Sequence, residues 1–582
     1  MKPAKEYFDL SLADLLITNG NVITVDPLFS TTRAVAIKDG KIVAVGSDED
    51  IRKLAGKKTR IIDLQGATVL PGINDTHCHM SDWALTRPPF KLETRYPTVK
   101  SIVDIVKMIQ NYAKNAKAGD WIQGEGWDEG YLKECKANPG RKPCKEDLDR
   151  VAPDNPVYLV EYSGHRSWCN SLALKIVGIT RDTPDPVGGR IDKDPDTGEP
   201  TGLLYEKASF RVGIAIPPWT YQQRKSAIPL AMNELNSLGI TSFTDAGVDR
   251  NKLATYNDAY NEYFKENRWT CRVNMLLSMG GMGPDPEDRF RNAVDSTKRA
   301  LKYIGTRHNF GNEWLRIVGV KLVADGIPPL KTAWMYDGYY LDGGKGSLTM
   351  DGSTPEDQEM NLRTLIILAH KNRYQVGIHC TGSRTADVCF DQYMKCIEED
   401  PWDARHYTIH SDFVKSETIE SVSRFGKKTG YELGMNVQSL IKWTISGLMD
   451  SIVGPAKAGY EWPERTMLDN GIHVADSSDA PVTYPDWRNG VQSAVLRESK
   501  ATGIVSGPGQ CITVPEAIRN YTLNGAWLDH LENVKGSIEP GKFADFCIVD
   551  KDILTIEPHK ISGLKVLMTI AGGRIVFDAG VI

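Results

Sequence analysis

The sequence predicts an α/β protein built on a TIM-like (β/α)8 barrel, with a small composite β-sandwich domain formed from both chain ends. Two observations predict this fold. Through the middle of the 582-residue chain, short apolar runs alternate with segments of helical spacing, which is the pattern of a parallel barrel. At both ends, strand-like runs are separated by turns, and neither end alone has enough strands for a stable core. We therefore expect the two ends to pair.

The N-terminal part of the predicted β-sandwich covers residues 1–71. Residues 34–37 and 42–45 are apolar runs on either side of Asp39-Gly40, and this arrangement predicts a hairpin. The C-terminal part covers residues 536–582 and has the same character. Its strand-like runs are residues 546–549, 566–570 and 574–577.

The barrel is predicted for the intervening residues 72–535. Helical spacing of apolar residues is clearest between Glu359 and His370. A stretch at about 81–211 is rich in Pro, Gly and Asp and fits the alternation poorly, so we expect an insertion over one end of the barrel. A loop at 279–284 is a candidate gate to the site, with a plain connection as the equal alternative. The candidate barrel strands are residues 240–244, 272–277, 315–322, 375–379, 407–410, 434–437 and 473–476.

Composition predicts a soluble cytoplasmic protein. The net charge of -5 and the absence of a long basic run give no indication of nucleic-acid binding. No run approaches the roughly 18 apolar residues that span a membrane, and the first residues lack the apolar segment of a secretion signal. The ten cysteines are scattered without C-x-x-C pairs, which indicates reduced thiols.

Two histidines point to a metal site. His77 and His79 follow the apolar run at 67–73, and side chains alternate across a strand, so both imidazoles are expected on the same face. Two neutral imidazoles that converge from one strand end form half of a transition-metal site. A histidine pair at this spacing is by itself weak, because most such pairs are incidental.

Further polar residues lie at the ends of the later strands. His379 and His410 each close an apolar run, Lys321 closes another, and Asp479 follows the last one. Taken singly, each has an ordinary explanation: a hydrogen-bonded histidine, a lysine that reaches solvent, or an aspartate that caps a helix. In a (β/α) barrel, however, the carboxyl ends of the strands meet at one mouth. We therefore expect these side chains to share one site.

The chain as a whole resembles a known family. The order H-x-H, Lys, His, His and Asp on successive strands is similar to that of the amidohydrolase superfamily. More narrowly, the chain resembles the YtcJ-like group, amidohydrolase family 3, which includes N-substituted formamide deformylases. The motifs that carry this likeness nearly end to end are 70–79, 126–129, 164–165, 170–171, 320–326, 405–406 with 410, 478–482, 521–526 and 536–545.

The resemblance implies a binuclear metal centre. His77 and His79 would bind a first metal together with Asp479, and His379 and His410 would bind a second. Lys321 would be carboxylated and would bridge both ions, because an ammonium cannot ligate a metal whereas a carbamate is anionic and offers two oxygens. Two zinc ions are expected, with manganese or iron as alternatives. A homodimer is also expected from the family.

The predicted reaction is hydrolysis of a C–N bond in an amide, formamide or N-acyl compound by a metal-bound hydroxide. Asp479 would take a proton from the water and pass it to the leaving nitrogen. The alternative from another class is a lyase, decarboxylase or isomerase on the same scaffold. A third alternative is a metal-free binding protein. The crowding of charged and imidazole groups argues against it, because such groups are costly to bury together without an ion.

Four residues are candidate contacts of a small, apolar or aromatic substrate. His165 lies in a Gly-His pair of the family and is a candidate catalytic residue, with a structural histidine as the alternative. Trp127, Asp128 and Trp334 are weaker candidates for substrate binding. Two departures from the family pattern lie beside predicted ligands: Ser383 replaces an expected aspartate, and Ile409 replaces a glutamate that often precedes the histidine of the sixth strand.

Overall fold

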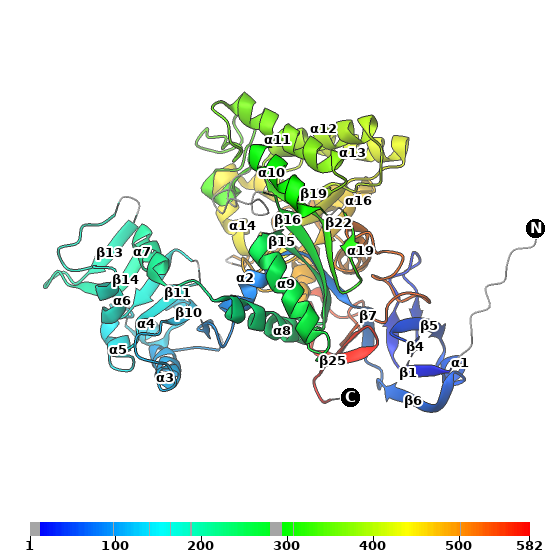
Figure 1. The fold of residues 1–582 in the computed structure, drawn as a ribbon, viewed down its shortest axis with the longest axis horizontal. Helices are drawn as coiled ribbons and strands as arrows, with labels where there is room; N and C mark the ends of the chain where they lie inside the picture. The colour runs from blue at the N-terminus through cyan, green and yellow to red at the C-terminus, as the bar shows by residue number, and fades with distance from the viewer. Residues whose placement is uncertain are drawn as a thin grey trace, which may run out of the picture. The chain divides into compact units, whose positions relative to one another are not determined.

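The computed structural model describes residues 12–581 except 97, 139, 163, 187–188, 280–293, 306–307 and 501. The predicted loop at 279–284 lies outside them beyond Met279. The chain forms two compact units (Figure 1), one made of residues 1–80 and 232–582 and the other of residues 81–231. The second unit is thus inserted into the first along the chain, and it contains the segment at about 81–211 that is predicted as an insertion.

The first unit contains a nearly closed parallel barrel, which confirms the predicted fold class. In the described residues its eight strands pair in the order β8-β15-β16-β18-β19-β20-β21-β22. At the seam between the first and last strands, the Thr76 hydroxyl donates to the Asp476 carbonyl oxygen over 3.0 Å. The strands are β8 (Ile73–Cys78), β15 (Ile240–Val248), β16 (Arg272–Ser278), β18 (Leu315–Val323), β19 (Gln375–Cys380), β20 (Tyr407–His410), β21 (Gly434–Val437) and β22 (His473–Asp476).

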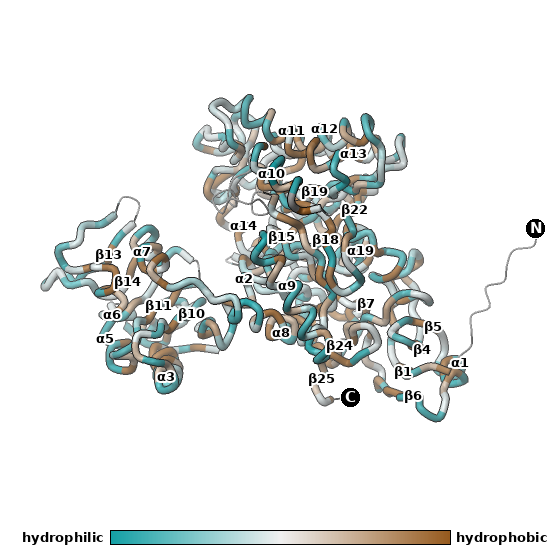
Figure 2. The backbone as a smooth tube through the Cα atoms, in the orientation of Figure 1, coloured by the Kyte–Doolittle hydropathy of each residue, from teal (hydrophilic) through white to brown (hydrophobic). Residues whose placement is uncertain are grey.

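Helices follow most of these strands. The predicted helical segment between Glu359 and His370 lies inside α11. Hydrophobic residues run along β18, of which every residue except Val323 is buried (Figure 2), as expected of a strand covered on both faces. α8 (Tyr221–Ser237) begins in the inserted unit and ends in the first unit. The longer helices of the barrel are α9 (Arg250–Tyr263), α10 (Val294–Ile304), α11 (Pro355–Lys371), α12 (Ser383–Glu399), α13 (Ser416–Thr429), α14 (Ser439–Val453) and α17 (Trp487–Leu496).

Both chain ends contribute to one small β-sandwich. In its six-stranded sheet, β7 from the N-terminal part pairs antiparallel with β23 from the C-terminal part, and Val69 lies opposite Ile548. A four-stranded sheet, β5-β4-β1-β6, contains the predicted hairpin. Its turn residues Asp39 and Gly40 both have positive φ, as a tight two-residue hairpin turn requires. One hydrophobic core contains Val22, Val35, Val69, Phe546 and Ile548.

The strands of the six-stranded sheet are β2 (Asn21–Ile23), β3 (Thr31–Thr32), β7 (Thr68–Pro71), β23 (Phe546–Val549), β24 (Val566–Ala571) and β25 (Arg574–Asp578). Those of the four-stranded sheet are β1 (Ala13–Thr18), β4 (Ala34–Lys38), β5 (Lys41–Gly46) and β6 (Ala55–Asp63).

A buried ion pair joins the barrel to the C-terminal part of the sandwich. Arg272, on β16, donates from Nε to Asp545 Oδ2 over 2.7 Å and from a terminal nitrogen to Oδ1 over 3.1 Å. Both side chains are almost fully buried. The guanidinium also lies 3.7 Å from the ring centroid of Phe543 and 4.3 Å from that of Trp314. This two-point contact satisfies a charge that would otherwise be costly to bury.

The inserted unit has a mixed six-stranded sheet of its own, in the order β13-β14-β12-β11-β10-β9. Its core includes Trp127 and Trp168, whose rings meet edge to face. Its strands are β9 (Leu92–Glu93), β10 (Ile122–Trp127), β11 (Val157–Glu161), β12 (Arg166–Cys169), β13 (Gly189–Lys193) and β14 (Pro200–Glu206). The helices used below are α3 (Ile102–Ala113) and α7 (Lys207–Ala215).

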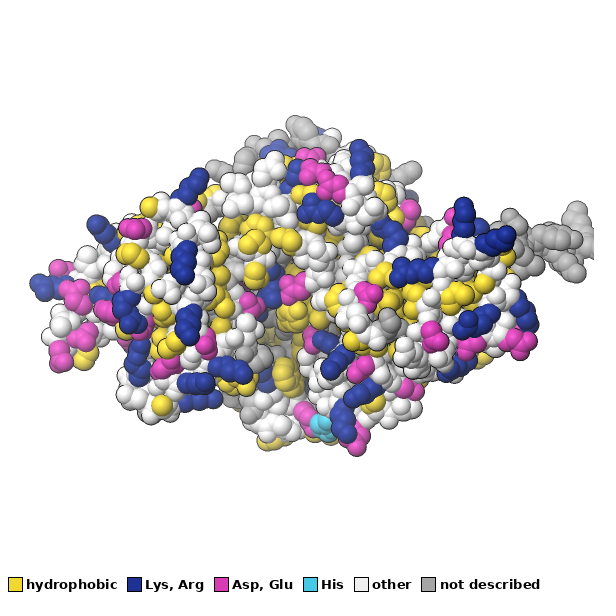
Figure 3. All heavy atoms as spheres, turned by 90° about the horizontal axis from the view of Figure 1, so that it is seen from below, with side chains coloured by type: hydrophobic (Ala, Val, Ile, Leu, Met, Phe, Trp, Pro, Cys, Tyr) yellow, Lys and Arg dark blue, Asp and Glu magenta, His cyan; other side chains and the backbone are white. Residues whose placement is uncertain are grey.

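Charged side chains of both signs are interspersed on the face of the molecule in Figure 3. None of the helices in the described part of the chain combines the length and the apolar character needed to cross a membrane.

Candidate metal centre

The predicted ligands come from five strands whose carboxyl ends lie at one mouth of the barrel. His77 is the second-last residue of β8 and His79 directly follows that strand. Lys321 lies on β18, and His379 lies on β19. His410 is the last residue of β20, and Asp479 comes three residues after β22 ends. The parallel register places these strand ends side by side: Cys380, next to His379, lies opposite His410.

Five of these side chains meet. Asp479 Oδ1 lies 3.3 Å from His77 Nε2 and 3.4 Å from His79 Nε2. Lys321 Nζ lies 3.4 Å from His77 Nε2. One ligand atom each from His77, His410 and Asp479 lies within 4.8 Å of the others, and all three residues are buried. Oxygen and imidazole nitrogen donors therefore converge in a space of the size of a metal site.

The backbone holds the first and last strands together at this point. The Asp479 amide donates to the His77 carbonyl oxygen over 2.9 Å, and the His79 amide donates to the Ala480 carbonyl oxygen over 2.7 Å. His410 and Asp479 have φ of 78° and 53°, in the left-handed region that non-glycine residues rarely adopt. Such strain persists where the surrounding structure enforces it, and it is frequent at functional sites.

Hydrogen bonds on the far side of two imidazoles set their orientation. His79 Nδ1 donates to the Ala246 carbonyl oxygen over 2.8 Å. His410 Nδ1 donates to Gln438 Oε1, also over 2.8 Å. Each bond leaves Nε2 of the ring on the side of the candidate site, where a metal would bind.

Gln438 is a residue that sequence reasoning missed. It follows β21, the seventh barrel strand, and its amide NH2 donates to Asn436 Oδ1 over 2.7 Å and to Ser477 Oγ over 3.0 Å. Because both donors are used, Oε1 must face His410. A polar residue directly after a barrel strand that has no predicted ligand is the signal that could have found it.

His379 is placed differently from His410, with which it is predicted to bind the second metal. Its ring centroid lies 4.4 Å from that of His410, but its Nε2 donates to the Gly326 carbonyl oxygen over 2.9 Å. Only Nδ1 of His379 is then left for a metal. Beside it, the buried Asp325 accepts from the amides of Thr381 and Gly382 over 3.1 and 2.8 Å, which anchors the loop after β19.

Burial governs the protonation of the site. It lowers the pKa of His77 to about 3, and the neighbouring Lys321 charge adds to the effect. It also lowers the pKa of Lys321 to about 8, against the opposing attraction of Asp479. Although burial on its own raises the pKa of Asp479, hydrogen bonds with His77 and His79 hold it well below its usual value. At neutral pH the site thus combines the neutral imidazole of His77 with the carboxylate of Asp479.

This donor set fits a divalent metal. Imidazoles that bind a metal must be neutral and a ligating aspartate must be ionised, and burial and contacts impose both states here. No carboxylate oxygen of a described residue lies within 4 Å of Lys321 Nζ, although the side chain is buried. A buried amine without an ion pair is costly as an ammonium, which is why its pKa falls towards neutral despite the attraction of Asp479.

The candidate contacts in the inserted unit have partners of their own. His165 is exposed, and its Nδ1 lies 3.1 Å from Glu206 Oε2. The carboxylate of Asp128 accepts from the Gly130 amide over 2.8 Å. Trp127 is fully buried and donates its indole N–H to the Leu159 carbonyl oxygen over 3.0 Å. Its indole is therefore part of the core of this unit.

Trp334 lies beside the barrel site. Its backbone amide donates to Asp325 Oδ2 over 3.0 Å, and Arg384 lies 4.2 Å from the centroid of its ring. The side chain is only 4% exposed. Of the two departures from the family pattern, Ser383 is buried next to the Met335 sulfur, and Ile409 packs in a hydrophobic cluster of the barrel. Neither introduces a charge beside the predicted ligands.

A parallel (β/α) barrel with imidazole, amine and carboxylate groups gathered at the carboxyl ends of its strands defines a barrel enzyme whose chemistry is carried out at that mouth. Comparison with known proteins gives the class more narrowly. The model of the amidohydrolase family matches residues 60–577. The chain belongs to this family and is a hydrolase.

Two relatives cover nearly the whole chain. YtcJ of Bacillus subtilis, which is assigned as an amidohydrolase, is 30% identical over 94% of this chain and 96% of its own. The N-substituted formamide deformylase of Arthrobacter pascens is 27% identical over 97% of this chain and 99% of its own. These matches confirm the resemblance stated from the motifs.

A solved structure shows the same fold. It is an uncharacterised metal-dependent hydrolase from Pyrococcus horikoshii, with a TM-score of 0.67 and 22% identity. The match covers 94% of this chain and 99% of that one.

Proposed function

We propose that the protein is a metal-dependent hydrolase that cleaves the C–N bond of a small amide, formamide or other N-acyl compound. The observation that carries the proposal is the convergence of His77, His410 and Asp479, with ligand atoms within 4.8 Å of one another, next to Lys321. The full-length similarity to a protein named as an N-substituted formamide deformylase supports the bond type. The substrate would be a small molecule.

A first divalent ion would be held by His77, His79 and Asp479, and a second ion would be held by His410 and His379. Zinc, manganese and iron are the candidate metals. His379 would use Nδ1, since its Nε2 is engaged by Gly326. A metal bound here would supply Lewis-acid activation of water and of the substrate carbonyl group.

Asp479 is the group that would move the proton. Against the effect of burial, hydrogen bonds with His77 and His79 hold the pKa of its carboxylate well below the usual value, so the group is ionised at neutral pH. It can therefore accept a proton from the attacking water. Oδ1 of this carboxylate lies within 3.4 Å of the Nε2 atoms of His77 and His79. These two rings would hold the carboxylate in place while it transfers that proton to the leaving nitrogen. The amine then departs as a neutral molecule.

Lys321 would serve as a bridging ligand after carboxylation. A pKa of about 8 leaves about one tenth of the side chains as neutral amine at pH 7, far more than for an exposed lysine. The free amine can attack carbon dioxide, forming an N–C bond and releasing one proton. The resulting carbamate would supply the anionic oxygens that an ammonium lacks.

The test is to incubate the purified enzyme with N-formyl, N-acetyl and N-benzoyl derivatives of aliphatic and aromatic amines in oxygen-18 water. We expect release of free amine and one oxygen-18 atom in the product acid. Asp479→Asn should retain most of the metal but lose about 10²-fold or more of the turnover. Asp469→Asn is the matched control, because Asp469 is an exposed helical aspartate whose change should leave the rate unaltered.

Products without the label would indicate a lyase or isomerase reaction on the same scaffold, and the hydrolytic proposal would then be wrong. A near wild-type rate for Asp479→Asn would overturn the role of Asp479 alone.

A further inference from the structure

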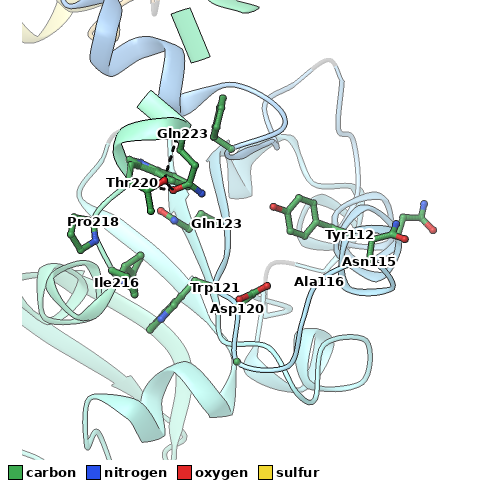
Figure 4. Close-up of a pocket in the computed structure, with 15 residues that line it drawn as sticks. Tyr112, Asn115, Ala116, Asp120, Trp121, Gln123, Ile216, Pro218, Thr220 and Gln223 are labelled. Atoms are coloured by element: carbon green, nitrogen blue, oxygen red, sulfur yellow. Dashed lines mark hydrogen bonds between the residues drawn. The ribbon is translucent and has the colours of Figure 1, made fainter. Parts of the chain in front are cut away.

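The inserted unit contains a hollow that is separate along the chain from every barrel ligand. Its volume is about 710 Å³, within the range of small-molecule sites. It lies at the C-terminal end of α3, the start of β10 and the segment 216–220 before α8 (Figure 4). All of its lining residues belong to the unit of residues 81–231.

Aromatic side chains form part of the wall. Trp121 and Tyr112 line the hollow and are half-buried. Phe90 and Trp219 also line it, and their rings meet edge to face with centroids 5.7 Å apart. Partly exposed aromatic faces that line a concave surface offer flat apolar area to a ring-shaped ligand.

Side-chain amides line another part of the wall. Gln123, on β10, comes two residues after Trp121, so the two side chains lie on the same side of the chain. No described residue hydrogen-bonds to the side-chain amide of Gln123. Gln223 is fixed by a capping box, in which its Oε1 accepts from the backbone amide of Thr220 over 2.9 Å and Thr220 Oγ1 accepts from the Gln223 amide over 3.3 Å. Figure 4 shows this pair on the side of the hollow opposite Tyr112 and Asn115. Because Oε1 is used, the NH2 of Gln223 is left to donate.

The charge of the wall restricts the ligand. Among the described lining residues there is no lysine, arginine or histidine, and Asp120 is the one carboxylate. Its Oδ2 accepts from the Lys117 amide over 3.1 Å. An anionic ligand would meet a negative charge and no cation. A wholly apolar ligand would leave the wall amides without hydrogen-bond partners, which is also unfavourable.

From this combination of aromatic faces, amides and missing cations, we propose that the hollow binds a neutral carbohydrate. The C–H face of a sugar ring would stack on Trp219 or Trp121, and its hydroxyl groups would pair with the amides of Gln123, Gln223 and Asn115. Hydroxyls both donate and accept, as side-chain amides do. This binding is independent of the reaction at the barrel.

The test is isothermal titration of the full-length protein with maltose, cellobiose and N-acetylglucosamine, with glucuronate as the anionic comparison. We expect at least one neutral sugar to bind and glucuronate to bind at least about tenfold more weakly. Trp219→Ala and Gln123→Ala should each weaken the binding by about tenfold or more, and Trp219→Phe by less. Phe210→Ala is the control, since Phe210 is an exposed aromatic of α7 in the same unit and does not line the hollow.

The proposal would be overturned by no binding of any of the neutral sugars, by binding that Trp219→Ala and Gln123→Ala leave unchanged, or by glucuronate binding as tight as that of the neutral sugars. Near-ultraviolet circular dichroism of each variant establishes that a loss of binding is not a loss of folding. The Asp479→Asn variant should bind the sugar as the wild type does, and a loss of binding in it would place the sugar in the barrel instead.

Discussion

His410 Nδ1 and Gln438 Oε1 are 2.8 Å apart, and this hydrogen bond determines which nitrogen of His410 faces the other candidate ligands. Gln438 has no freedom to turn, because its NH2 is held by Asn436 and Ser477. A histidine ligand whose second nitrogen is fixed in this way keeps its tautomer and ring orientation. The end of the seventh strand thus supports a ligand on the sixth.

Removing the Gln438 amide should weaken metal binding. Gln438→Leu keeps the size of the side chain but removes the acceptor for His410 Nδ1, so we expect metal affinity to fall by about 10- to 100-fold. Competition with a chelator of known affinity measures this change directly. Gln375→Leu is a matched control, because Gln375 is an equally buried glutamine whose amide bonds to the Arg405 and Leu528 carbonyl oxygens. Equal metal affinity in the wild type and Gln438→Leu would contradict the positioning role.

Lys321 should be required as a carboxylated side chain and not as a cation. We expect Lys321→Ala to lose the bridging ligand and activity together, with partial recovery on adding acetate or propionate. Lys321→Arg keeps a positive charge but cannot form the carbamate, and it should stay inactive with or without these acids. The measurement is the steady-state rate across a carboxylate titration. An active Lys321→Ala enzyme without added acid would refute the bridge.

Acid should destabilise the metal-free protein partly through His77. In the unfolded chain this imidazole takes up a proton as the pH falls through about 6.5, whereas in the folded protein burial keeps it neutral down to about 3. Between these values the unfolded chain binds more protons, so the free energy of unfolding falls with decreasing pH. This group contributes up to about 1.4 kcal/mol per pH unit.

Urea unfolding of chelator-treated protein at a series of pH values between these limits tests this prediction. His77→Asn, which has no titrating group at this position, should show a smaller loss of stability than the wild type. Identical pH profiles for the two proteins would show that His77 is not held neutral.

The Arg272–Asp545 pair should contribute strongly to stability. Asp545→Ala leaves a guanidinium that is buried without its carboxylate, at an expected cost of about 3–5 kcal/mol. Asp469→Ala, which breaks the exposed pair with Arg465, should cost less than about 1 kcal/mol. Thermal or urea unfolding compares the two variants. Restoration of stability in Arg272→Met/Asp545→Ala would attribute the loss to the unpaired charge, and an unaffected Asp545→Ala would contradict the account.

The barrel could be predicted because each strand is an apolar run in alternation with helices. The positions of His77, Lys321, His410 and Asp479 could be predicted because each ends or follows such a run. Gln438 could not be predicted, since a single glutamine after a strand has no motif and its role depends on contacts with Asn436 and Ser477.

Two further features depend on contacts that the sequence does not reveal. The turn of His379 towards Gly326 is set by the loop after β18, which lies 53 residues earlier in the chain. The end of the inserted unit at residue 231 falls inside α8, whose first part belongs to that unit and whose last part belongs to the unit of the barrel. Such long-range packing leaves no local pattern.

The most direct test of the metal centre is elemental analysis of the purified protein by mass spectrometry, as moles of each transition metal per mole of chain. The account predicts about two ions of zinc, manganese or iron per chain, and a clear loss in a His77→Ala/His410→Ala variant. About one ion would contradict the binuclear arrangement and the bridging role of Lys321. No bound metal, even after growth with added metal, would contradict the central claim.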